Sequence, residues 1–363
     1  MTTVRLYGLV RGYGSYAQVL RGFERAFRQH GYGPDRCVTV GIEERSDEEM
    51  PGLATADAAV FLGPPIACSA VRQHAEHRIR AVMVAPNSDK LPDATMRVVN
   101  EHATHVLAPS AWAATTLFRY TEKPIIVVPH GVHPEFQPSP GMGLEGAYEH
   151  GEFRVLHLSS STRERKGTLE LVQAWRRLRT QHAVPETARL WLIVPPETRA
   201  RLIEWCADEG ETLDSLGLLI GPRLGIGQEG ASPEMLTKVY AGVHVVCQPS
   251  RGEAFGFVGL EALASGVPIV ATTCTGHGEW FRAGLDGAVP VHASAPAPID
   301  DYPGAMAPIV HVADIAEAIE WSYENWHKLK AAALVNAQKV RLEWAWERQT
   351  EAFVRWLEGE AGK

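Results

Sequence analysis

The sequence has 363 residues, of which 45% are hydrophobic and 21% charged, and its formal net charge is −8. This length predicts about two domains, each able to bury its own core, and the acidic balance argues against non-specific binding to duplex nucleic acid. No apolar run is long enough to span a membrane, the first residues lack the pattern of a signal peptide, and the five cysteines form no CxxC pair. We therefore expect a cytoplasmic protein.

The first third of the chain alternates short β-branched runs with amphipathic stretches. Ser15 is placed to cap the first helix, at 15–30, whose apolar side chains recur at the spacing of one helix face. We expect strands at 4–10, 37–42, 58–63, 79–84, 105–108 and 125–128, and further helices at 69–78, 93–103 and 111–119. This alternation predicts a parallel sheet with right-handed helical crossovers.

A stretch rich in proline and glycine then interrupts the pattern and predicts a linker at 136–152. A second alternating series follows it. Its expected strands are 154–159, 190–194, 216–220, 243–247 and 267–272, and its expected helices are 168–180, 197–208, 232–241 and 257–265. The fold class predicted is therefore α/β, with two Rossmann-like domains, 1–135 and 153–325, facing across a cleft. A helical, tryptophan-rich tail at 326–363 is expected to pack back across both.

The most informative stretch is PSRGEAFGFVGLE at 249–261, between a predicted strand and a predicted helix. A loop that enters a helix N-terminus presents free N–H groups and the positive end of the helix dipole, which suit an anion. Glu253 and Glu261 flank this position, eight residues apart. Because carboxylates do not favour phosphate directly, we expect them to accept hydrogen bonds from neighbouring hydroxyl groups. A sugar linked to a nucleoside diphosphate supplies both the hydroxyls and the anion.

A basic turn, SSSTRERKGT at 159–168, follows the first strand of the same half. Carboxyl ends of parallel strands meet at one edge of a sheet, so we expect this turn to lie near Glu253. There, Lys166 and a neighbouring arginine would neutralise the charge that grows on a departing diphosphate. A solvated turn before a helix is the alternative interpretation.

These two loops, together with Gly12-Tyr13-Gly14-Ser15 and the segment VPHGV at 128–132, resemble the retaining GT-B glycosyltransferases of family 4, or glycosyl transferases group 1. The resemblance covers most of the chain. It implies a GT-B fold and a nucleotide-sugar donor linked to UDP, GDP or ADP. It also implies transfer of a hexose-type sugar, with retention, to a hydroxyl of an acceptor glycan, lipid or other compound. No metal or other cofactor is expected, since the chain lacks a D-x-D motif.

The resemblance also implies roles for individual residues. Glu253 would contact the donor sugar and act with Lys166 and Arg165 as the catalytic group, while Glu261 would contact the ribose. The other candidate donor-binding residues are Gly14, Ser160, Arg163, Phe255, Gly256, Phe257 and Val258. Family members usually carry an arginine six positions before the lysine, where this chain has Ser160. Which of Arg163 and Arg165 supplies the second cation therefore stays open.

On the acceptor side the candidates are Asp89, which follows the predicted strand 79–84, and His130, which lies before the linker. An Asx turn and a hinge contact are the alternative interpretations of these two residues. The helix 15–30 carries three arginines and one glutamate, which predicts at most a peripheral contact with the inner face of a membrane.

We therefore expect a metal-independent hexosyltransferase of glycan or glycoconjugate synthesis. Two alternatives stay open: a catalytically silent nucleotide-sugar-binding subunit that assists a partner, and another GT-B enzyme such as an epimerase or a phosphorylase. The serine at position 160 keeps the first of these open. Release of nucleoside diphosphate from a nucleotide sugar separates transfer from binding alone.

Overall fold

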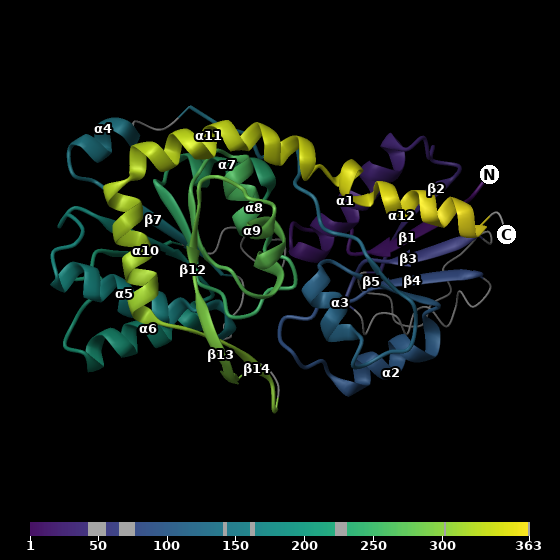
Figure 1. The fold of residues 1–363 in the computed structure, drawn as a ribbon, viewed down its shortest axis with the longest axis horizontal. Coiled ribbons are helices and arrows are strands. Elements are labelled where there is room, and N and C mark those ends of the chain that lie inside the picture. Colours follow the sequence, from purple (N-terminus) through teal and green to yellow (C-terminus); the bar gives the residue numbers. More distant parts are fainter. Residues whose placement is uncertain are drawn as a thin grey trace.

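The computed structural model describes residues 1–42, 56–64, 77–140, 144–159, 164–221, 231–300 and 303–361. Within these ranges the chain forms two six-stranded parallel sheets, flanked by helices and set side by side in two domains (Figure 1). This arrangement confirms the predicted fold class. The predicted helix at 69–78 lies, except for its last two residues, outside the described part of the chain.

The sheet of the first domain has the strand order β2-β1-β3-β4-β5-β6. Its strands are β1 (Val4–Gly8), β2 (Cys37–Gly41), β3 (Ala58–Phe61), β4 (Ile79–Met83), β5 (His105–Ala108) and β6 (Ile125–Val127). Its helices include α1 (Ser15–Gln29), α2 (Asp93–His102) and α3 (Ala111–Leu117). The strand order reverses between β1 and β3, so the loop from β1 into α1 opens at the sheet's switch point, where ligands bind in such folds.

The sheet of the second domain has the order β12-β11-β10-β7-β8-β9. Its strands are β7 (Arg154–Leu158), β8 (Arg189–Ile193), β9 (Leu218–Gly221), β10 (Val245–Gln248), β11 (Ile269–Thr272) and β12 (Ala288–Val291). Its helical segments include η2 (Glu164–Lys166), α5 (Thr168–Thr180), α6 (Pro196–Asp208), α7 (Pro233–Ala241), α8 (Phe257–Ala264), η3 (Thr275–His277) and α9 (Gly278–Arg282). Here β7 and β10 are neighbours at the switch point, so the two loops that follow them share one edge of the sheet.

The patterns of apolar residues explain these elements. The strands β3 and β11 are apolar along most of their length and buried at every position, as central strands of a parallel sheet are when both faces are covered. In α5 the residues Leu171, Trp175 and Leu178 recur on one face and are buried against the sheet. The indole of Trp175 donates a hydrogen bond to the Leu216 carbonyl at 2.7 Å, which satisfies its buried N–H.

The C-terminal helices connect the two domains. They are α10 (Val312–Glu324), α11 (Trp326–Glu343) and α12 (Trp346–Ala361). In Figure 1, α11 runs along the second domain, where it packs on α8, and α12 continues along the first domain, where it packs on α1. At the crossing, the Val132 amide donates to the Trp344 carbonyl at 2.7 Å, and the ring of Trp346 lies 5.9 Å from that of Phe23. Both passages of the chain between domains therefore meet at one buried aromatic cluster.

Two features of the fold differ from the expectation. A short helix, α4 (Leu144–Glu149), lies inside the predicted linker and buries Leu144. A hairpin, β13 (Ala293–Pro298) with β14 (Met306–Val310), follows β12. These two strands contain three prolines. Because proline is normally tolerated only at sheet edges, the sequence does not indicate strands here.

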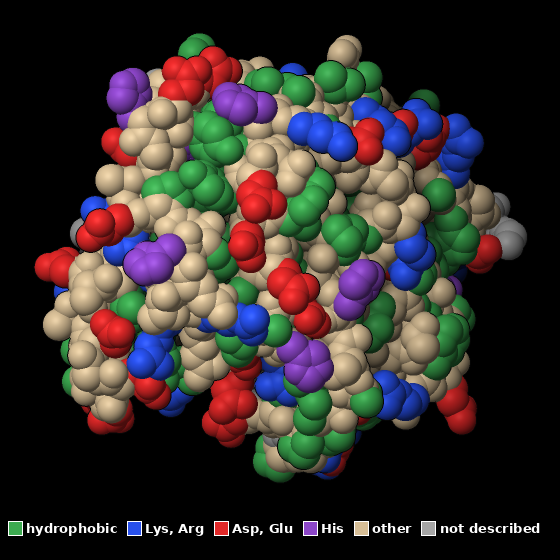
Figure 2. Space-filling model, turned by 60° about the vertical axis from the view of Figure 1, so that its left-hand side comes forward, with side chains coloured by type: hydrophobic (Ala, Val, Ile, Leu, Met, Phe, Trp, Pro, Cys, Tyr) green, Lys and Arg blue, Asp and Glu red, His purple; other side chains and the backbone are tan. Residues whose placement is uncertain are grey.

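The molecular surface is mixed in character. Acidic, basic and hydrophobic side chains are intermixed on the face shown in Figure 2. In the part of the chain that the structure describes, no helix is both long and apolar enough to cross a membrane.

Candidate active site in the interdomain cleft

A cavity of about 240 Å³ lies between the two domains, at the carboxyl ends of both sheets. Both domains contribute residues to it. Two Rossmann-like domains that face each other bind their ligands in this position, between the carboxyl ends of their sheets. The polar side chains on its walls include those of Ser15, Asn87, His130, Lys166, Glu253 and His277.

The loop between β10 and α8 forms one wall of this cavity. Gly256 precedes α8 with a φ of 94°, in the left-handed region that glycine adopts without strain. A Cβ atom here would stand 2.2 Å from Cδ2 of His277, so a side chain would also collide with that ring. The turn brings Phe257 and Val258, the first residues of α8, to the cavity wall. The unpaired N–H groups of this helix end therefore lie at the cleft, as an anion site requires.

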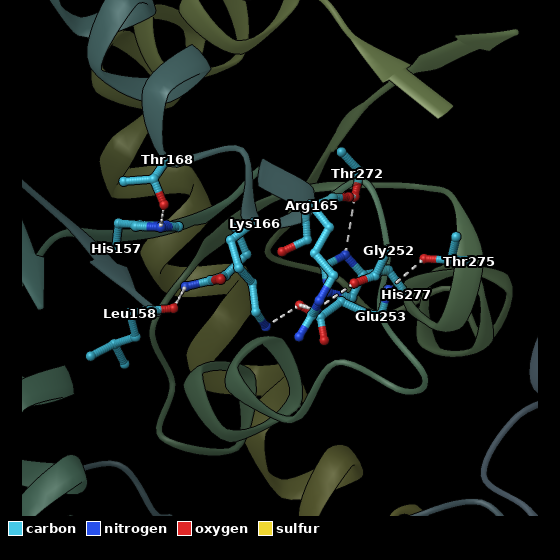
Figure 3. A network of polar contacts seen from close by, with 12 residues as sticks. His157, Leu158, Arg165, Lys166, Thr168, Gly252, Glu253, Thr272, Thr275 and His277 are labelled. Carbon is cyan, nitrogen blue, oxygen red and sulfur yellow. Dashed lines mark hydrogen bonds and ion pairs between the residues drawn. The ribbon is translucent and has the colours of Figure 1, made fainter. Parts of the chain in front are cut away.

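Glu253 pairs with the basic turn that precedes α5. Its Oε1 atom lies 2.5 Å from Nζ of Lys166 and 3.7 Å from Nη1 of Arg165, as Figure 3 shows from close by. These side chains are only 13%, 13% and 11% exposed. Burial alone would raise the pKa of Glu253, but Lys166, Arg165 and His277 lower it more, to about 2. The group is therefore a carboxylate held among cations.

Hydrogen bonds from two directions fix the backbone around Glu253. On one side, Nη1 of Arg165 donates to the Gly252 carbonyl at 2.7 Å, and the Arg251 amide donates to the Arg165 carbonyl at 2.6 Å. On the other side, the Glu253 amide donates to Oγ1 of Thr275 at 3.1 Å (Figure 3). Arg165 thus holds the loop in place as well as contributing charge.

Two buried histidines face the cleft from opposite domains. The ring of His130 stacks on Phe257 with centroids 4.9 Å apart, and burial lowers its pKa to about 3. Among the described residues, Nδ1 of His130 has no hydrogen-bond partner. The pKa of His277 falls to about 4, chiefly through burial, and its Nδ1 lies 3.2 Å from Oγ1 of Thr272. Both rings are neutral hydrogen-bonding groups near neutral pH.

Glu261 has different surroundings from Glu253, although both belong to one motif. It lies within α8, where the hydroxyl of Tyr240 donates a hydrogen bond to its Oε2 at 3.0 Å. Burial raises its pKa to about 7, although the bond from Tyr240 acts in the opposite direction. Glu261 is not among the residues that line the cavity in the described structure. One motif therefore holds a carboxyl with a pKa of about 2, which is ionised at neutral pH, and one with a pKa of about 7.

The structure brings most of the predicted site residues together at the cavity. Those that line it are Arg165, Lys166, Glu253, Phe255, Gly256, Phe257, Val258 and His130. Gly14 directly precedes Ser15, which lines the cavity at the start of α1. Ser160 and Arg163 lie outside the described residues, so of the two candidate arginines only Arg165 can be placed.

Asp89 lies elsewhere. Its Oδ1 accepts a hydrogen bond from the Met306 amide at 2.7 Å, its Oδ2 lies 3.7 Å from Nη1 of Arg119, and it does not line the cavity. Asn87, two positions earlier, does line it. The structure thus places Asn87, and not Asp89, at the cavity wall, because packing sets the direction of each side chain in a loop.

Ser15 and Gln248 also line the cavity, although neither was among the candidate site residues chosen from the sequence. Each has a positional signal, since Ser15 begins α1 and Gln248 ends β10, at the sheet edges where ligands bind.

Comparison with known proteins agrees with this geometry. Residues 152–325 match the model of the family described as glycosyl transferases group 1. A D-inositol 3-phosphate glycosyltransferase from Corynebacterium urealyticum is 29% identical over 158 residues, which cover 42% of this chain and 35% of the relative. The protein of the same name from Mycolicibacterium gilvum is 38% identical over 90 residues, or 23% and 20% of the two chains. The matched part thus spans about a third or less of these curated relatives.

Solved structures match the chain along its whole length. HepE of Anabaena, determined in complex with UDP and glucose, has a TM-score of 0.66 at 15% identity and covers 99% of this chain and 100% of its own. The sucrose-phosphate synthase of Thermosynechococcus elongatus has a TM-score of 0.71, also at 15% identity, with 100% of both chains covered. At such identity the likeness concerns the fold. It shows that this chain has the GT-B fold, and the family match shows that residues 152–325 are similar to the glycosyl transferases group 1.

Proposed function

We propose that the protein is a retaining glycosyltransferase that moves a hexose-type sugar from a nucleotide-sugar donor to an acceptor hydroxyl, in glycan or glycoconjugate synthesis. The observation that carries this proposal is the buried cluster of Glu253, Lys166 and Arg165, which lines the interdomain cavity together with the first residues of α8. It combines an acceptor of hydroxyl hydrogen bonds with cations suited to a diphosphate.

In this proposal the donor lies along the edge of the second sheet. Lys166, Arg165 and the first N–H groups of α8 bind the diphosphate, which is linked to uridine, guanosine or adenosine. Glu253 accepts hydrogen bonds from the sugar hydroxyls and Glu261 from the ribose. Fixed cations and a helix N-terminus stabilise the charge of the leaving group in a water-poor cleft, so we propose that transfer needs no metal ion.

The pKa values of the cleft side chains bear on how the acceptor proton leaves. Glu253, with a pKa of about 2, His130, with about 3, and His277, with about 4, are all weak bases. The departing diphosphate is a stronger base, since the second ionisation of a phosphate group has a pKa of about 6. We infer that the acceptor hydroxyl attacks the anomeric carbon as the bond from that carbon to the phosphate oxygen breaks. The leaving oxygen takes the electron pair and then the acceptor proton, which places attack and departure on one face of the sugar.

The first domain would bind the acceptor. His130 and Asn87 line the cavity from this side, and His130 offers a neutral ring whose Nδ1 has no partner among the described residues. The acceptor class stays a glycan, a lipid or another hydroxyl compound. A cytoplasmic location is proposed, with at most peripheral membrane contact, and Cys37, Cys206, Cys247 and Cys274 are free thiols, as in a reducing compartment.

The test measures release of nucleoside diphosphate from a panel of UDP-, GDP- and ADP-sugars, with and without acceptors. Turnover of one donor is expected, with K166M raising its KM roughly ten- to hundredfold because a charge-assisted bond to phosphate is lost. K339M, on the exposed face of α11, is the matched control and keeps the wild-type KM. Tight donor binding without turnover under all conditions would contradict the proposal and favour a non-catalytic binding subunit.

A further inference from the structure

The β13–β14 hairpin extends from the second domain to the first. In Figure 1 it leaves the sheet after β12 and runs along the gap between the domains. At its far end, the Met306 amide donates to Oδ1 of Asp89, at 2.7 Å, in the loop that follows β4 of the first domain. The hairpin therefore spans the two domains on the side opposite to the α11–α12 crossing.

The same strand also contacts the loop that carries Glu253. Nε of Arg251 donates to the Pro308 carbonyl at 2.9 Å, and Arg251 is only 8% exposed. Met306 and Pro308 are two positions apart in β14, so their backbone N–H and C=O groups point to the same edge of the strand. Asp89 and Arg251 thus satisfy neighbouring groups on the one edge of β14 that β13 leaves unpaired.

The Glu253 loop touches the first domain directly as well. Oγ of Ser110, at the start of α3, donates to the Ala254 carbonyl at 2.7 Å in a buried position. A Cβ atom at Gly252 would stand 2.0 Å from the Asn87 carbonyl oxygen, so only glycine permits this approach of the two backbones. Residues 249–256 therefore contact the hairpin, the basic turn and the first domain.

We propose that Arg251 is a positioning residue that couples domain closure to the placement of Glu253. Arg251 joins the loop to β14, and the bond from Met306 to Asp89 joins β14 to the first domain. The position of the loop that holds Glu253 against Lys166 is thereby tied to the contact between the two domains. For its effect on catalysis this inference rests on the proposed function; for its effect on loop order it does not.

The first measurement is hydrogen exchange of the backbone amides in 249–256 of the full chain, which needs no substrate. R251M removes the donor to Pro308, and D89A removes the acceptor for Met306. Each is expected to speed exchange in this loop roughly three- to tenfold, as loss of one hydrogen bond does. D89N keeps an acceptor oxygen and R251K keeps a donor, so both should restore slow exchange. D89A removes a partly exposed side chain, so it tests the coupling even where R251M does not fold.

The second measurement separates positioning from a merely structural role. Lys166 and α8 belong to the second domain alone, so R251M and D89A are expected to leave the Kd of nucleoside diphosphate unchanged. Because a misplaced group costs rate and not ground-state binding, kcat should fall roughly ten- to hundredfold in both variants. D89N and R251K should recover most of that kcat.

Unchanged exchange in 249–256 for both R251M and D89A would overturn the coupling. A D89N variant that behaves like D89A would also overturn it, because Asp89 would then act through its charge, for instance on an acceptor. If the wild type turns over no nucleotide sugar, the proposed function fails, while the exchange data still decide whether Arg251 and Asp89 order the loop.

Discussion

The ammonium group of Lys166 lies 2.5 Å from the carboxylate of Glu253, although 87 positions separate the two residues in the chain. They meet because β7 and β10 are neighbours at the switch point of the second sheet, so the loops after both strands open at one edge. Each group thus neutralises the other in a site with little access to water.

This pairing predicts opposite effects on binding and on transfer when Glu253 is changed. In E253Q the sugar loses its charged hydrogen-bond acceptor, and we expect kcat to fall roughly a hundredfold. Lys166 and Arg165 then face no carboxylate, so the Kd of nucleoside diphosphate should stay the same or decrease. Calorimetric titration and steady-state kinetics measure the two effects. Glu204, exposed on α6, supplies the control variant E204Q; equal losses of affinity and kcat in E253Q would contradict the assigned role.

Glu261 predicts a pH dependence of nucleotide binding. Because burial raises its pKa to about 7, the free protein gains the carboxylate form as pH rises through neutrality. Ribose hydroxyls donate hydrogen bonds, which favour that form, so binding should release a proton. Affinity for nucleoside diphosphate is expected to increase roughly three- to tenfold between pH 6 and pH 8.

The variant E261Q isolates this effect, because it removes the titration of residue 261 and leaves the titration of the nucleotide's phosphate groups unchanged. Calorimetry in two buffers of different ionisation enthalpy counts the protons released. The same pH slope in E261Q and in the wild type would exclude Glu261 from nucleotide binding.

Four buried histidines predict a loss of stability in mild acid. Burial lowers the pKa of His130 to about 3 and the pKa values of His157, His244 and His277 to about 4. In the unfolded chain the pKa of a histidine is near 6.5. Between about pH 4 and pH 6.5 the unfolded state therefore binds more protons than the folded state. The contribution of these groups to the free energy of unfolding is therefore complete above about pH 6.5 and is lost as pH falls towards 4.

Urea unfolding at pH 7, 6 and 5 measures this slope. His244 shows the cause, since its Nδ1 accepts a hydrogen bond from the Arg154 amide at 2.9 Å and protonation would remove that acceptor. H244Q is expected to reduce the slope by about one proton, whereas H327Q, at an exposed position, should not. A flat profile between pH 7 and pH 5 would contradict the neutral burial of these rings.

The contact between α1 and α12 predicts a large effect of one methyl group. A Cβ atom at Gly22 would stand 2.2 Å from the ring of Trp346, so G22A should lower the free energy of unfolding by roughly 2 to 3 kcal/mol through overpacking. The matched control is G359A, in α12, where nothing lies within 4 Å of the added atom. It should be neutral or stabilise by up to about 1 kcal/mol. Equal melting temperatures of G22A and the wild type would show that the helices separate at little cost.

Much of the site could be predicted because its charged residues and glycines lie in short segments of the sequence. The alternation of strands and helices predicts parallel sheets, and parallel sheets place the loops after β7 and β10 at one edge. The glycine before α8 and the spacing of Glu253 and Glu261 are visible in one loop. The sequence by itself therefore determined the fold class, the cleft and most of the residues that line it.

Only the tertiary structure decided what depends on contacts between distant segments. It separated the pKa values of Glu253 and Glu261, because one carboxyl packs against cations and the other in a largely apolar interior. It turned Asp89 towards Met306 and formed a hairpin from a proline-rich stretch that has no periodic signal. Electrostatic environment and side-chain direction arise from packing between elements, and no local run of residues encodes them.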